Sequence, residues 1–293
     1  MNTPDFATES PLLPIRTVAV IGLGLLGGRG ADSQVRVIGW ARRAETREFA
    51  IDNDFVDAVS DDFIEASKLA DLVIIATPVD RIAEYALKIA AACPHVLITD
   101  VGSTKCGIVQ AVATVPEAMA RFVASHPIAG SEKTGIEHAR GGVLDDKLVG
   151  LTPSGTENSG VVDAIERFWQ STGARTLRLS PQRHDELMAV TSHAPHLLAA
   201  VVARQVPEEA LRMVGSGWLD TTRIAAGDEG LWTAIVCENR AAILAAIQAT
   251  AQDLSQLIEI IQSADDPALT TYLRDARKRR EAASSPPSFP PPS

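Results

Sequence analysis

The sequence predicts an α/β domain followed by an all-helical domain, and two patterns lead to this prediction. From Thr17 to about Arg178, short runs rich in β-branched residues alternate with stretches of helical composition. Strands that alternate with helices form a mostly parallel sheet covered on both faces. After Pro181 the strand pattern ends, and the chain as far as about Arg280 has helical periodicity. We therefore expect an α/β domain over residues 14–180 and a helical domain over residues 181–283.

Seven apolar runs are the candidate strands. The run DLVIIA is apolar throughout, without alternation, which is typical of a strand buried on both faces of a sheet. In chain order the runs are TVAVIG, VRVIGW, DLVIIATP, HVLITDVG, RFVASHP, KLVGLTP and ARTLRL.

One long helix is predicted in the second domain, from Glu229 to Ser263. The apolar residues that recur along it at helical spacing are Ile243, Ile247, Leu254, Ile258 and Ile261. At 1.5 Å per residue such a helix would be about 50 Å long, more than a lone domain needs, so a second subunit is expected to cover it. Two helices broken near Gln252 and Asp253 are the alternative.

Composition excludes several classes of protein. The net charge of −10, from 27 Lys and Arg against 37 Asp and Glu, opposes binding to nucleic acid or an anionic membrane. Three scattered cysteines form no CxxC pair, so we expect neither a disulfide framework nor a metal site, and a reducing cytoplasm fits best. No apolar run approaches the ~18 residues of a membrane span, and the acidic N-terminus does not resemble a signal peptide. The Pro- and Ser-rich ends, residues 1–13 and 284–293, are expected to be disordered.

The glycines of TVAVIGLGLLGG follow the first predicted strand directly. Gly22, Gly24 and Gly27 have the G-x-G-x-x-G spacing of a Rossmann-like dinucleotide-binding loop. Gly22 permits the tight turn, Gly24 lets a pyrophosphate approach the backbone, and Gly27 lets the next helix pack on the strand. The backbone N–H groups of Leu25 and Leu26 would then face the phosphates. The alternative is a glycine-rich turn that binds no ligand.

The segment after this loop is short. Seven residues, GRGADSQ, separate Gly27 from Val35, where the next strand begins, whereas a parallel crossover normally takes about a dozen residues or more. The helix that holds the pyrophosphate would therefore have at most about two turns. Either the fold tolerates a minimal crossover, or cofactor binding is impaired.

Two arginines follow the second predicted strand. An acidic residue at this point would bind the ribose 2′-hydroxyl of NAD, and none is present. Arg42, Arg43 and Thr46 stand instead where the 2′-phosphate of NADP would lie, which favours NADP over NAD. The alternative is that both arginines only solvate the start of a helix.

Polar residues follow three other predicted strands. In an open parallel sheet, ligands bind outside the carboxyl ends of the strands. His126, just past a strand end, is well placed for acid/base chemistry there, and the alternative is a loop histidine without a role. These residues are Thr77 and Pro78, then Asp100, Ser103 and Lys105, and finally Ser125, His126 and Glu132.

The first helix of the second domain carries a polar stripe. At 100° per residue, Asp185, Ser192 and His196 share one narrow face, whereas His193 lies off it and Pro195 loosens the helix between the two histidines. A polar stripe on an apolar helix indicates a polar cleft, and a solvent-facing stripe is the alternative.

Asp220 and Arg223 follow in GWLDTTRIAAGD. The forked guanidinium suits a carboxylate ligand, and the alternative is a surface ion pair between these two residues.

Five motifs make the chain similar to the prephenate/arogenate (cyclohexadienyl) dehydrogenases of tyrosine biosynthesis. They are VIGLGLLGG, TDVGSTK, SHPIAGSEKTG, SPQRHDELMAVTSHAPHLLA and DTTRIA, in the order of that family. The resemblance implies a nucleotide-binding domain, a helical domain that forms a homodimer through its C-terminal helices, and NAD(P)-dependent oxidative decarboxylation of prephenate, arogenate or both. It does not indicate which substrate is preferred.

The resemblance also implies roles for individual residues. His126 would accept the proton of the ring hydroxyl, and Ser103 would orient His126 and the nicotinamide. Arg223 would hold a substrate carboxylate. Other residues implied at the substrate pocket are Ser192, His196, Asp220 and Glu132, and those implied at the cofactor are Thr77, Pro78 and Ser103.

Two other functions are weaker interpretations. A non-catalytic relative that binds the substrate or an aromatic amino acid is favoured only by the short segment after Gly27. Nucleic-acid binding through residues 277–280 is disfavoured, because four cations at a helix end complement the helix dipole.

Overall fold

The computed structural model describes residues 14–24, 35–129, 135–138 and 142–284. The chain divides into two compact units, residues 1–243 and residues 244–293. Both expected disordered ends fall almost wholly outside the described residues, although Ser284 closes the last helix.

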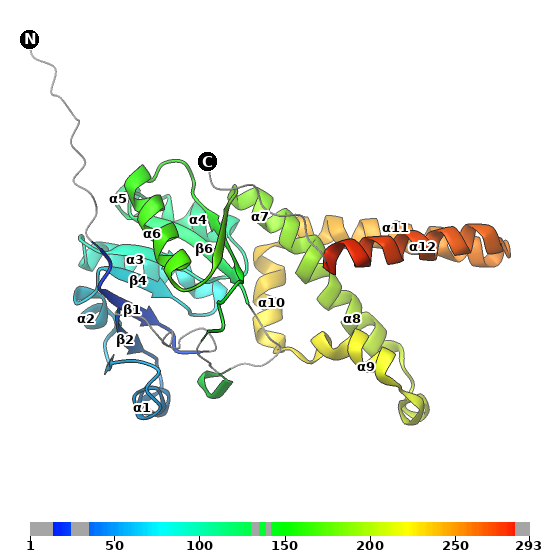
Figure 1. The fold of residues 1–293 in the computed structure, drawn as a ribbon, viewed down its shortest axis with the longest axis horizontal. Coiled ribbons are helices and arrows are strands. Elements are labelled where there is room, and N and C mark those ends of the chain that lie inside the picture. The colour runs from blue at the N-terminus through cyan, green and yellow to red at the C-terminus, as the bar shows by residue number, and fades with distance from the viewer. Residues whose placement is uncertain (1–13, 25–34, 130–134, 139–141, 285–293) are drawn as a thin grey trace, which may run out of the picture. The chain divides into compact units, whose positions relative to one another are not determined.

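An eight-stranded sheet forms the frame of the first unit, with strand order β3-β2-β1-β4-β5-β6-β7-β8 (Figure 1). All neighbouring pairs are parallel except β6 and β7. The strands are β1 Thr17–Ile21, β2 Arg36–Trp40, β3 Ala58–Ser60, β4 Leu72–Ile75, β5 Leu97–Asp100, β6 Phe122–Ile128, β7 Leu148–Thr152 and β8 Arg175–Arg178.

All seven predicted strands are present, and the mostly parallel sheet is confirmed. The eighth strand, β3, was not predicted. It has three residues, pairs only with β2, and buries none of its side chains, so it lacks the apolar pattern that marks the others.

Helices cover both faces of the sheet, as a buried parallel sheet requires. Alternate residues of β1 face opposite sides, with Val18 and Val20 in one apolar cluster and Ala19 and Ile21 in the other. The covering helices are α1 Ala44–Asp52, α2 Phe63–Lys68, α3 Ile82–Ala92, α4 Cys106–Val112, α5 Pro116–Met119 and α6 Ser159–Ser171.

The chain after Pro181 is helical, as predicted. Its elements are α7 Pro181–Met188, the π-helix η3 Ala189–His193, α8 Ala194–Gln205, η4 Glu208–Met213, α9 Ser216–Thr222, η5 Arg223–Ala226, α10 Glu229–Glu238, α11 Arg240–Gln262 and α12 Asp266–Ser284.

The prediction of one helix from Glu229 to Ser263 is wrong, and so is the alternative break near Gln252 and Asp253. The chain breaks at Asn239, whose backbone leaves the helical region at φ −113° and ψ 33°. Its side chain donates to the carbonyl oxygen of Asp185 at 2.8 Å and contacts Nδ1 of His193 at 3.2 Å. These tertiary bonds fix the break, and a periodicity argument does not contain them.

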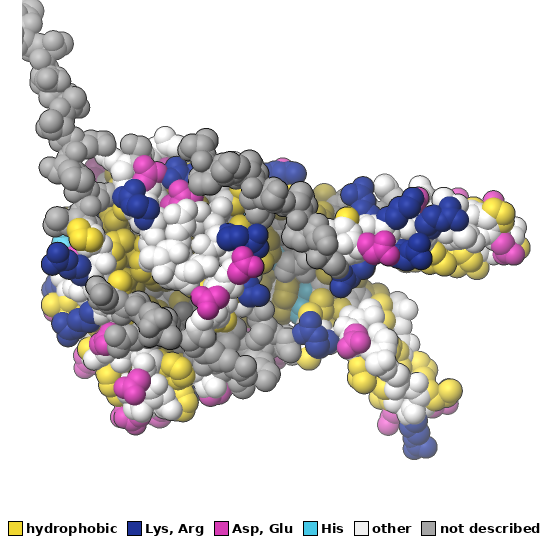
Figure 2. Space-filling view, in the orientation of Figure 1, with side chains coloured by type: hydrophobic (Ala, Val, Ile, Leu, Met, Phe, Trp, Pro, Cys, Tyr) yellow, Lys and Arg dark blue, Asp and Glu magenta, His cyan; other side chains and the backbone are white. Residues whose placement is uncertain are grey.

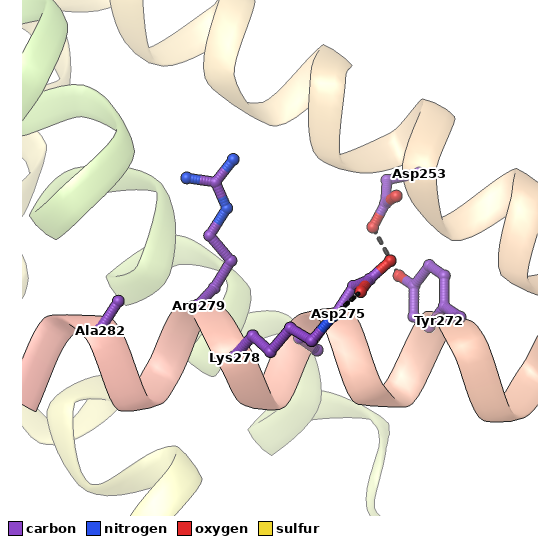
Figure 3. A pocket seen from close by; sticks show the side chains of 7 residues that line it. Asp253, Tyr272, Asp275, Lys278, Arg279 and Ala282 are labelled. Atoms are coloured by element: carbon purple, nitrogen blue, oxygen red, sulfur yellow. Dashed lines mark hydrogen bonds and ion pairs between the residues drawn. The ribbon is translucent and has the colours of Figure 1, made fainter.

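The second unit is a pair of helices, formed by α11 from Leu244 onward and by α12. The Tyr272 hydroxyl meets Asp253 at 2.5 Å, beside a hollow lined by residues of both helices (Figure 3). Lys and Arg side chains gather along α12 (Figure 2). Acidic neighbours accompany them, since Arg277 pairs with Glu281 at 3.6 Å and Lys278 with Asp275 at 3.5 Å. The run at residues 277–280 is thus part of a mixed-charge helix surface.

One helical stretch of the described residues, Pro181–Gln205, is long and apolar enough to span a membrane by length and composition alone. Its polar side chains His184, Asp185, His193 and His196 are buried within the first unit.

Candidate active site

The carboxyl ends of the central strands meet at one edge of the sheet. Ile21 of β1 is level with Ile75 of β4, which is level with Asp100 of β5. The segments that follow these three residues therefore lie together where an open parallel sheet binds its ligand.

The residues after β1 and β4 fit a dinucleotide. Gly22 has a φ of 106°, and a Cβ there would lie 2.5 Å from the carbonyl oxygen of Ala76, so only glycine allows this close turn. A Cβ at Gly24 would meet no atom of the described residues within 4 Å. The Thr77 hydroxyl is buried and finds no hydrogen-bond partner among the described residues. A ligand that supplies polar atoms would satisfy it.

Some of the other residues expected at the cofactor are described by the structure, and the rest lie outside the described residues. Arg42 and Arg43 are exposed, directly after β2, and Arg43 precedes the first turn of α1. Thr46 is half-buried in α1, and Pro78 is exposed before the short helix η1 Val79–Arg81. Leu25, Leu26 and Gly27 lie outside the described residues, as does the short segment that follows them.

A buried ion pair at the end of β5 is bonded to Ser125 in the middle of β6. Lys105 and Asp100 are both fully buried, and the Lys105 ammonium bonds to Asp100. The ammonium also donates to the carbonyl oxygen of Ser125 at 2.8 Å, and the Ser125 N–H donates to Asp100 at 3.1 Å. These bonds fix the backbone immediately before His126.

His126 lies within β6, which corrects the expectation that it comes just past a strand end. After Val123, β6 continues because Ala124–Ile128 pair antiparallel with Leu148–Thr152 of β7. The His126 ring is 8% exposed, and its Nδ1 lies 2.9 Å from Nε2 of His184 in α7.

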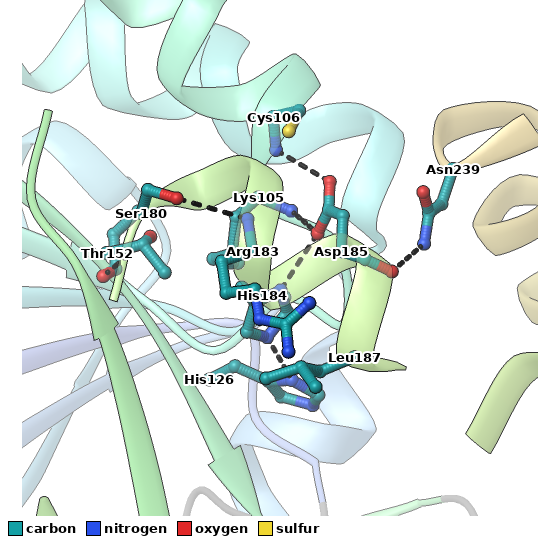
Figure 4. Close-up of polar contacts among 12 residues, drawn as sticks. Lys105, Cys106, His126, Thr152, Ser180, Arg183, His184, Asp185, Leu187 and Asn239 are labelled. Carbon is teal, nitrogen blue, oxygen red and sulfur yellow. Dashed lines mark hydrogen bonds and ion pairs between the residues drawn. The ribbon is translucent and has the colours of Figure 1, made fainter. Parts of the chain in front are cut away.

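Asp185 is the centre of the polar contacts beside His126 (Figure 4). Its Oδ1 accepts the backbone N–H of Lys105 at 2.8 Å, and its Oδ2 accepts that of Cys106 at 2.9 Å. Its Oδ1 is also 2.8 Å from Nδ1 of His184. A continuous line of hydrogen bonds therefore runs from the start of α4 through Asp185 and His184 to His126.

Burial controls the charges in this cluster. It lowers the pKa of His126 well below the ordinary value, and the neighbouring His184, Lys105 and His193 lower it further. Burial would raise the pKa of Asp185, but the His184 hydrogen bond and the two backbone N–H groups outweigh it and lower that pKa. The site therefore holds a carboxylate at Asp185 and a neutral imidazole at His126 at neutral pH.

His193, which the helical step places off the polar stripe, is buried in the core. This side chain is 1% exposed, and its Nδ1 contacts the Asn239 amide at 3.2 Å. The π-helix η3, immediately before α8 and its Pro195, shifts the angular positions of later residues. A constant 100° step therefore does not carry from Asp185 to the far side of η3.

His196 and Ser192 retain positions that suit a cleft. His196 is 6% exposed, and its ring stacks on Trp232 of α10 with centroids 3.4 Å apart. Ser192 is half-buried. Burial lowers the pKa of His196, so this ring too favours the neutral form.

The remaining expected site residues do not join the hydrogen-bonded cluster around Asp185 within the described part of the chain. Ser103 is half-buried after β5 and, among the described residues, makes no hydrogen bond to His126. Asp220 and Arg223 are exposed, in α9 and at the start of η5. Glu132 lies outside the described residues.

Three residues that contact the site were missed from the sequence. His184 is part of the hydrogen-bond line, Asn239 donates to the main-chain carbonyl oxygen of Asp185, and Trp232 stacks on His196. The adjacent pair His184–Asp185 in the first turns after Pro181 was the available signal, because a His beside an Asp on a helix that faces a sheet is an acid/base combination.

A dinucleotide-binding sheet whose carboxyl edge carries a buried, neutral histidine defines a nucleotide-dependent dehydrogenase. Residues 29–178 match the family described as prephenate dehydrogenase, nucleotide-binding domain, and residues 180–275 match prephenate dehydrogenase, dimerization domain. The chain belongs to the prephenate dehydrogenase family.

Relatives with curated names agree with this assignment. A prephenate dehydrogenase of Bacillus subtilis is 30% identical over 279 residues, which cover 90% of this chain and 75% of the relative. A cyclohexadienyl dehydrogenase of Zymomonas mobilis is 30% identical over 280 residues, which cover 90% of this chain and 95% of the relative.

Solved structures of this family have the same fold. Prephenate dehydrogenase from A. aeolicus, in complex with hydroxyphenyl propionate and NAD+, superposes with a TM-score of 0.84 at 28% identity, covering 92% of this chain and 99% of that one. Synechocystis arogenate dehydrogenase superposes with a TM-score of 0.78 at 25% identity, covering 91% and 99%.

Proposed function

We propose that this chain catalyses the NAD(P)-dependent oxidative decarboxylation of prephenate, arogenate or both, a step of tyrosine biosynthesis. The observation that carries the proposal is the buried His126 at the carboxyl edge of a nucleotide-binding sheet, in a chain whose two domains both match the family. Relatives named for prephenate, cyclohexadienyl and arogenate substrates support all three variants of the activity.

The bond changes define what the residues have to do. The ring carbon that bears the hydroxyl loses a hydride, and a nicotinamide dinucleotide held by Gly22, Gly24 and Thr77 would supply the hydride acceptor. The ring carboxylate leaves as CO2, and the electron pair of its C–C bond completes the aromatic ring. His126 takes the hydroxyl proton as the carbonyl forms and returns it to the oxygen as the phenol appears, so no net proton is released. Aromatisation drives the reaction, and the residues mainly position the reacting groups.

Arg223 is proposed to hold a substrate carboxylate. The substrate carries two carboxylates, and a planar guanidinium binds a carboxylate through paired, charge-assisted hydrogen bonds. His196, Ser192 and Asp220 are proposed to line the same pocket, together with Glu132. Ser103 is proposed to orient His126 and the nicotinamide once both ligands are bound.

NADP is the proposed cofactor, with NAD as the alternative. Arg42 and Arg43 directly follow β2 without a carboxylate between them and the strand, and both side chains are exposed. A guanidinium at this point favours a 2′-phosphate, whereas an acidic residue would favour the ribose hydroxyl of NAD. Gly22, Gly24, Thr77 and Pro78 would line the rest of the cofactor site.

A homodimer in a reducing cytoplasm is the proposed state of the protein. The match to a dimerization domain supports it, and α11 exposes the large apolar side chains Leu244, Leu254, Ile258 and Ile261. An apolar helix face of this kind requires cover in water. The three cysteines, Cys93, Cys106 and Cys237, are free thiols.

The deciding experiment is a four-way assay. Purified protein is mixed with prephenate or arogenate, each with NAD or NADP, and reduced nicotinamide is followed by its absorbance. Turnover with either substrate supports the proposal, and the ratio of kcat/KM values assigns substrate and cofactor. Binding of substrate without turnover by any pair would instead support the non-catalytic alternative.

A further inference from the structure

His126 is the last member of a buried hydrogen-bond line that begins at the N-terminal end of α4. The line passes through Asp185 and His184, both on α7, and each of the three side chains is less than 10% exposed. Two of its members were not assigned to the reaction above. Because imidazole nitrogens exchange donor and acceptor roles between tautomers, the direction of this line decides which nitrogen of His126 carries the proton.

The direction follows from Asp185. Its two carboxylate oxygens face the backbone N–H groups of Lys105 and Cys106, and an N–H group can only donate. The low pKa of Asp185 agrees with a carboxylate that accepts at both oxygens. Nδ1 of His184, 2.8 Å from Oδ1 of Asp185, must then carry a proton and donate it.

The next bond is fixed by the first. When His184 carries this proton alone, its Nε2 has a lone pair, and this nitrogen lies 2.9 Å from Nδ1 of His126. In that protonation state Nδ1 of His126 is the donor. Its own lone pair is then on Nε2, the nitrogen that the line leaves unused.

We propose that His184 and Asp185 are positioning residues that hold His126 in its Nδ1–H tautomer, so that Nε2 is the atom that accepts the substrate's hydroxyl proton. The inference rests on the proposed function for the identity of the reaction. The tautomer itself is a property of the ligand-free protein. Without the line, an isolated histidine would populate both tautomers, and one of them presents a proton where the base is required.

The other charged and titratable groups around His126 do not compete for this role. Lys105 is committed to Asp100 and to the Ser125 carbonyl, and His193 bonds to Asn239. Ser103 makes no hydrogen bond to His126 within the described part of the chain. His184 is thus the partner through which the rest of the cluster acts on the His126 ring.

The kinetic test compares three variants of α7. His184→Phe keeps a ring in the cavity but removes the acceptor, and we expect kcat to fall roughly tenfold to a hundredfold, as for loss of a group that orients a reactive side chain. KM for the substrate and Kd for the cofactor should stay within about threefold, because in this proposal His184 acts only through His126. His184→Gln keeps an acceptor oxygen and should recover most of kcat.

Ser180→Ala is the matched structural control. Ser180 is the N-cap of the same helix, where its side chain accepts the backbone N–H of Arg183 at 3.1 Å. Its loss should lower stability by about 1 kcal/mol and leave kcat unchanged. An equal loss of kcat in Ser180→Ala and His184→Phe would mean that α7 acts only as a support, and the proposal would fail.

The direct test is the 15N spectrum of histidine-labelled protein without ligands, since imidazole 15N shifts distinguish the two tautomers. The His126 signals are assigned by their absence in His126→Gln. We expect a protonated Nδ1 and an unprotonated Nε2 in the unmodified protein, and mixed tautomers in His184→Phe. A protonated Nε2 in the unmodified protein overturns the inference even if the enzyme is active. Failure of the four-way assay with the expected tautomer present would reject only the proposed function.

Discussion

The ammonium of Lys105 donates to the carbonyl oxygen of Ser125 at 2.8 Å, one residue before His126 in the chain. The backbone N–H of the same lysine donates to Asp185 at 2.8 Å. The side chain of Lys105 therefore bonds to β6, the strand that carries His126. Its main chain bonds to α7, the helix that carries His184. Its complete burial beside Asp100 makes it a structural centre of the site.

Replacement of Lys105 by Met should destabilise the protein strongly. The substitution leaves the Asp100 carboxylate buried without its ion-pair partner, which typically costs about 3–5 kcal/mol in the free energy of unfolding. Urea unfolding measures the loss. Arg178→Met is the control, because Arg178 forms its ion pairs at the surface, with its side chain 44% exposed, and should cost at most about 1 kcal/mol. Equal losses in both variants would contradict a buried ion pair.

Replacement of His126 by Ala should abolish turnover and leave cofactor binding intact. A general base contributes roughly two to four orders of magnitude in rate, so kcat should fall by that factor. Calorimetry with the nucleotide should give a Kd close to that of the unmodified protein, since the ring acts on the substrate hydroxyl. His95→Ala, on an exposed loop before β5, is the control and should change neither quantity. Loss of nucleotide binding with turnover retained at saturation would overturn the role of His126.

The sheet was predictable from the sequence because a strand buried on both faces is a run of apolar residues. Leu72–Ile75 is apolar and buried at every position, and each of the seven predicted runs contains a strand. The strand Ala58–Ser60 has no such run, because a short edge strand buries little. Asn239 ends α10 through bonds to Asp185 and His193, which are distant in the sequence. The local sequence pattern therefore does not predict this helix end.

The candidate site was predictable only in part. His126 was found from its position near a strand end, and the general rule for parallel sheets indicated the correct edge. The partner of His126 was missed, because His184 does not share the helical face assigned to Asp185 and His196. The π-helix before Pro195 was not predicted either, because a constant helical step cannot anticipate an i to i+5 turn.

Activity should persist into mildly acidic solution. A base works in its deprotonated form, and burial lowers the pKa of His126 well below its ordinary value. An unperturbed histidine would lose half of its base form at about pH 6.5, so kcat/KM should instead remain level through pH 6 and fall only at lower pH. The profile of kcat/KM between pH 5 and 8 measures this, with circular dichroism at each pH as the control for unfolding. A half-maximal point near 6.5 would contradict a buried neutral His126.

Replacement of Arg223 by Ala should act mainly on substrate binding. Loss of a charge-assisted partner costs about 1.5–3 kcal/mol, which corresponds to a rise in KM of roughly tenfold to a hundredfold. Arg223→Lys keeps the charge without the planar fork and should give an intermediate KM. Arg212→Ala, at an exposed position in η4, is the control. An unchanged KM for both prephenate and arogenate would assign Arg223 a structural role.

Replacement of Arg42 by Asp should shift the cofactor preference toward NAD. The new carboxylate would follow β2 directly, where it can accept the ribose hydroxyls of NAD and repel the 2′-phosphate of NADP. We expect NADP to bind the unmodified protein in the micromolar range, because Gly22 forms the tight turn and the buried Thr77 hydroxyl has no hydrogen-bond partner among the described residues. Calorimetric titration of both nucleotides against both proteins measures the change. Arg36→Asp is the control, because Arg36 lies at the opposite end of β2 and its replacement should leave the preference unchanged. Arg47→Asp is unsuitable, because Arg47 bonds to the carbonyl oxygen of Ala41 at 2.6 Å.

The same titration also decides whether the short segment after Gly27 is compatible with a working enzyme. The seven residues that separate Gly27 from Val35 allow at most about two helical turns, and only the N–H groups of the first turn of a helix are free to face a pyrophosphate. Micromolar binding of either nucleotide would mean that the first turn is sufficient, because the N-terminal N–H groups supply most of the phosphate contacts. No heat with either nucleotide at millimolar concentration would mean that the site is lost, and the buried His126 would then serve a binding protein without turnover.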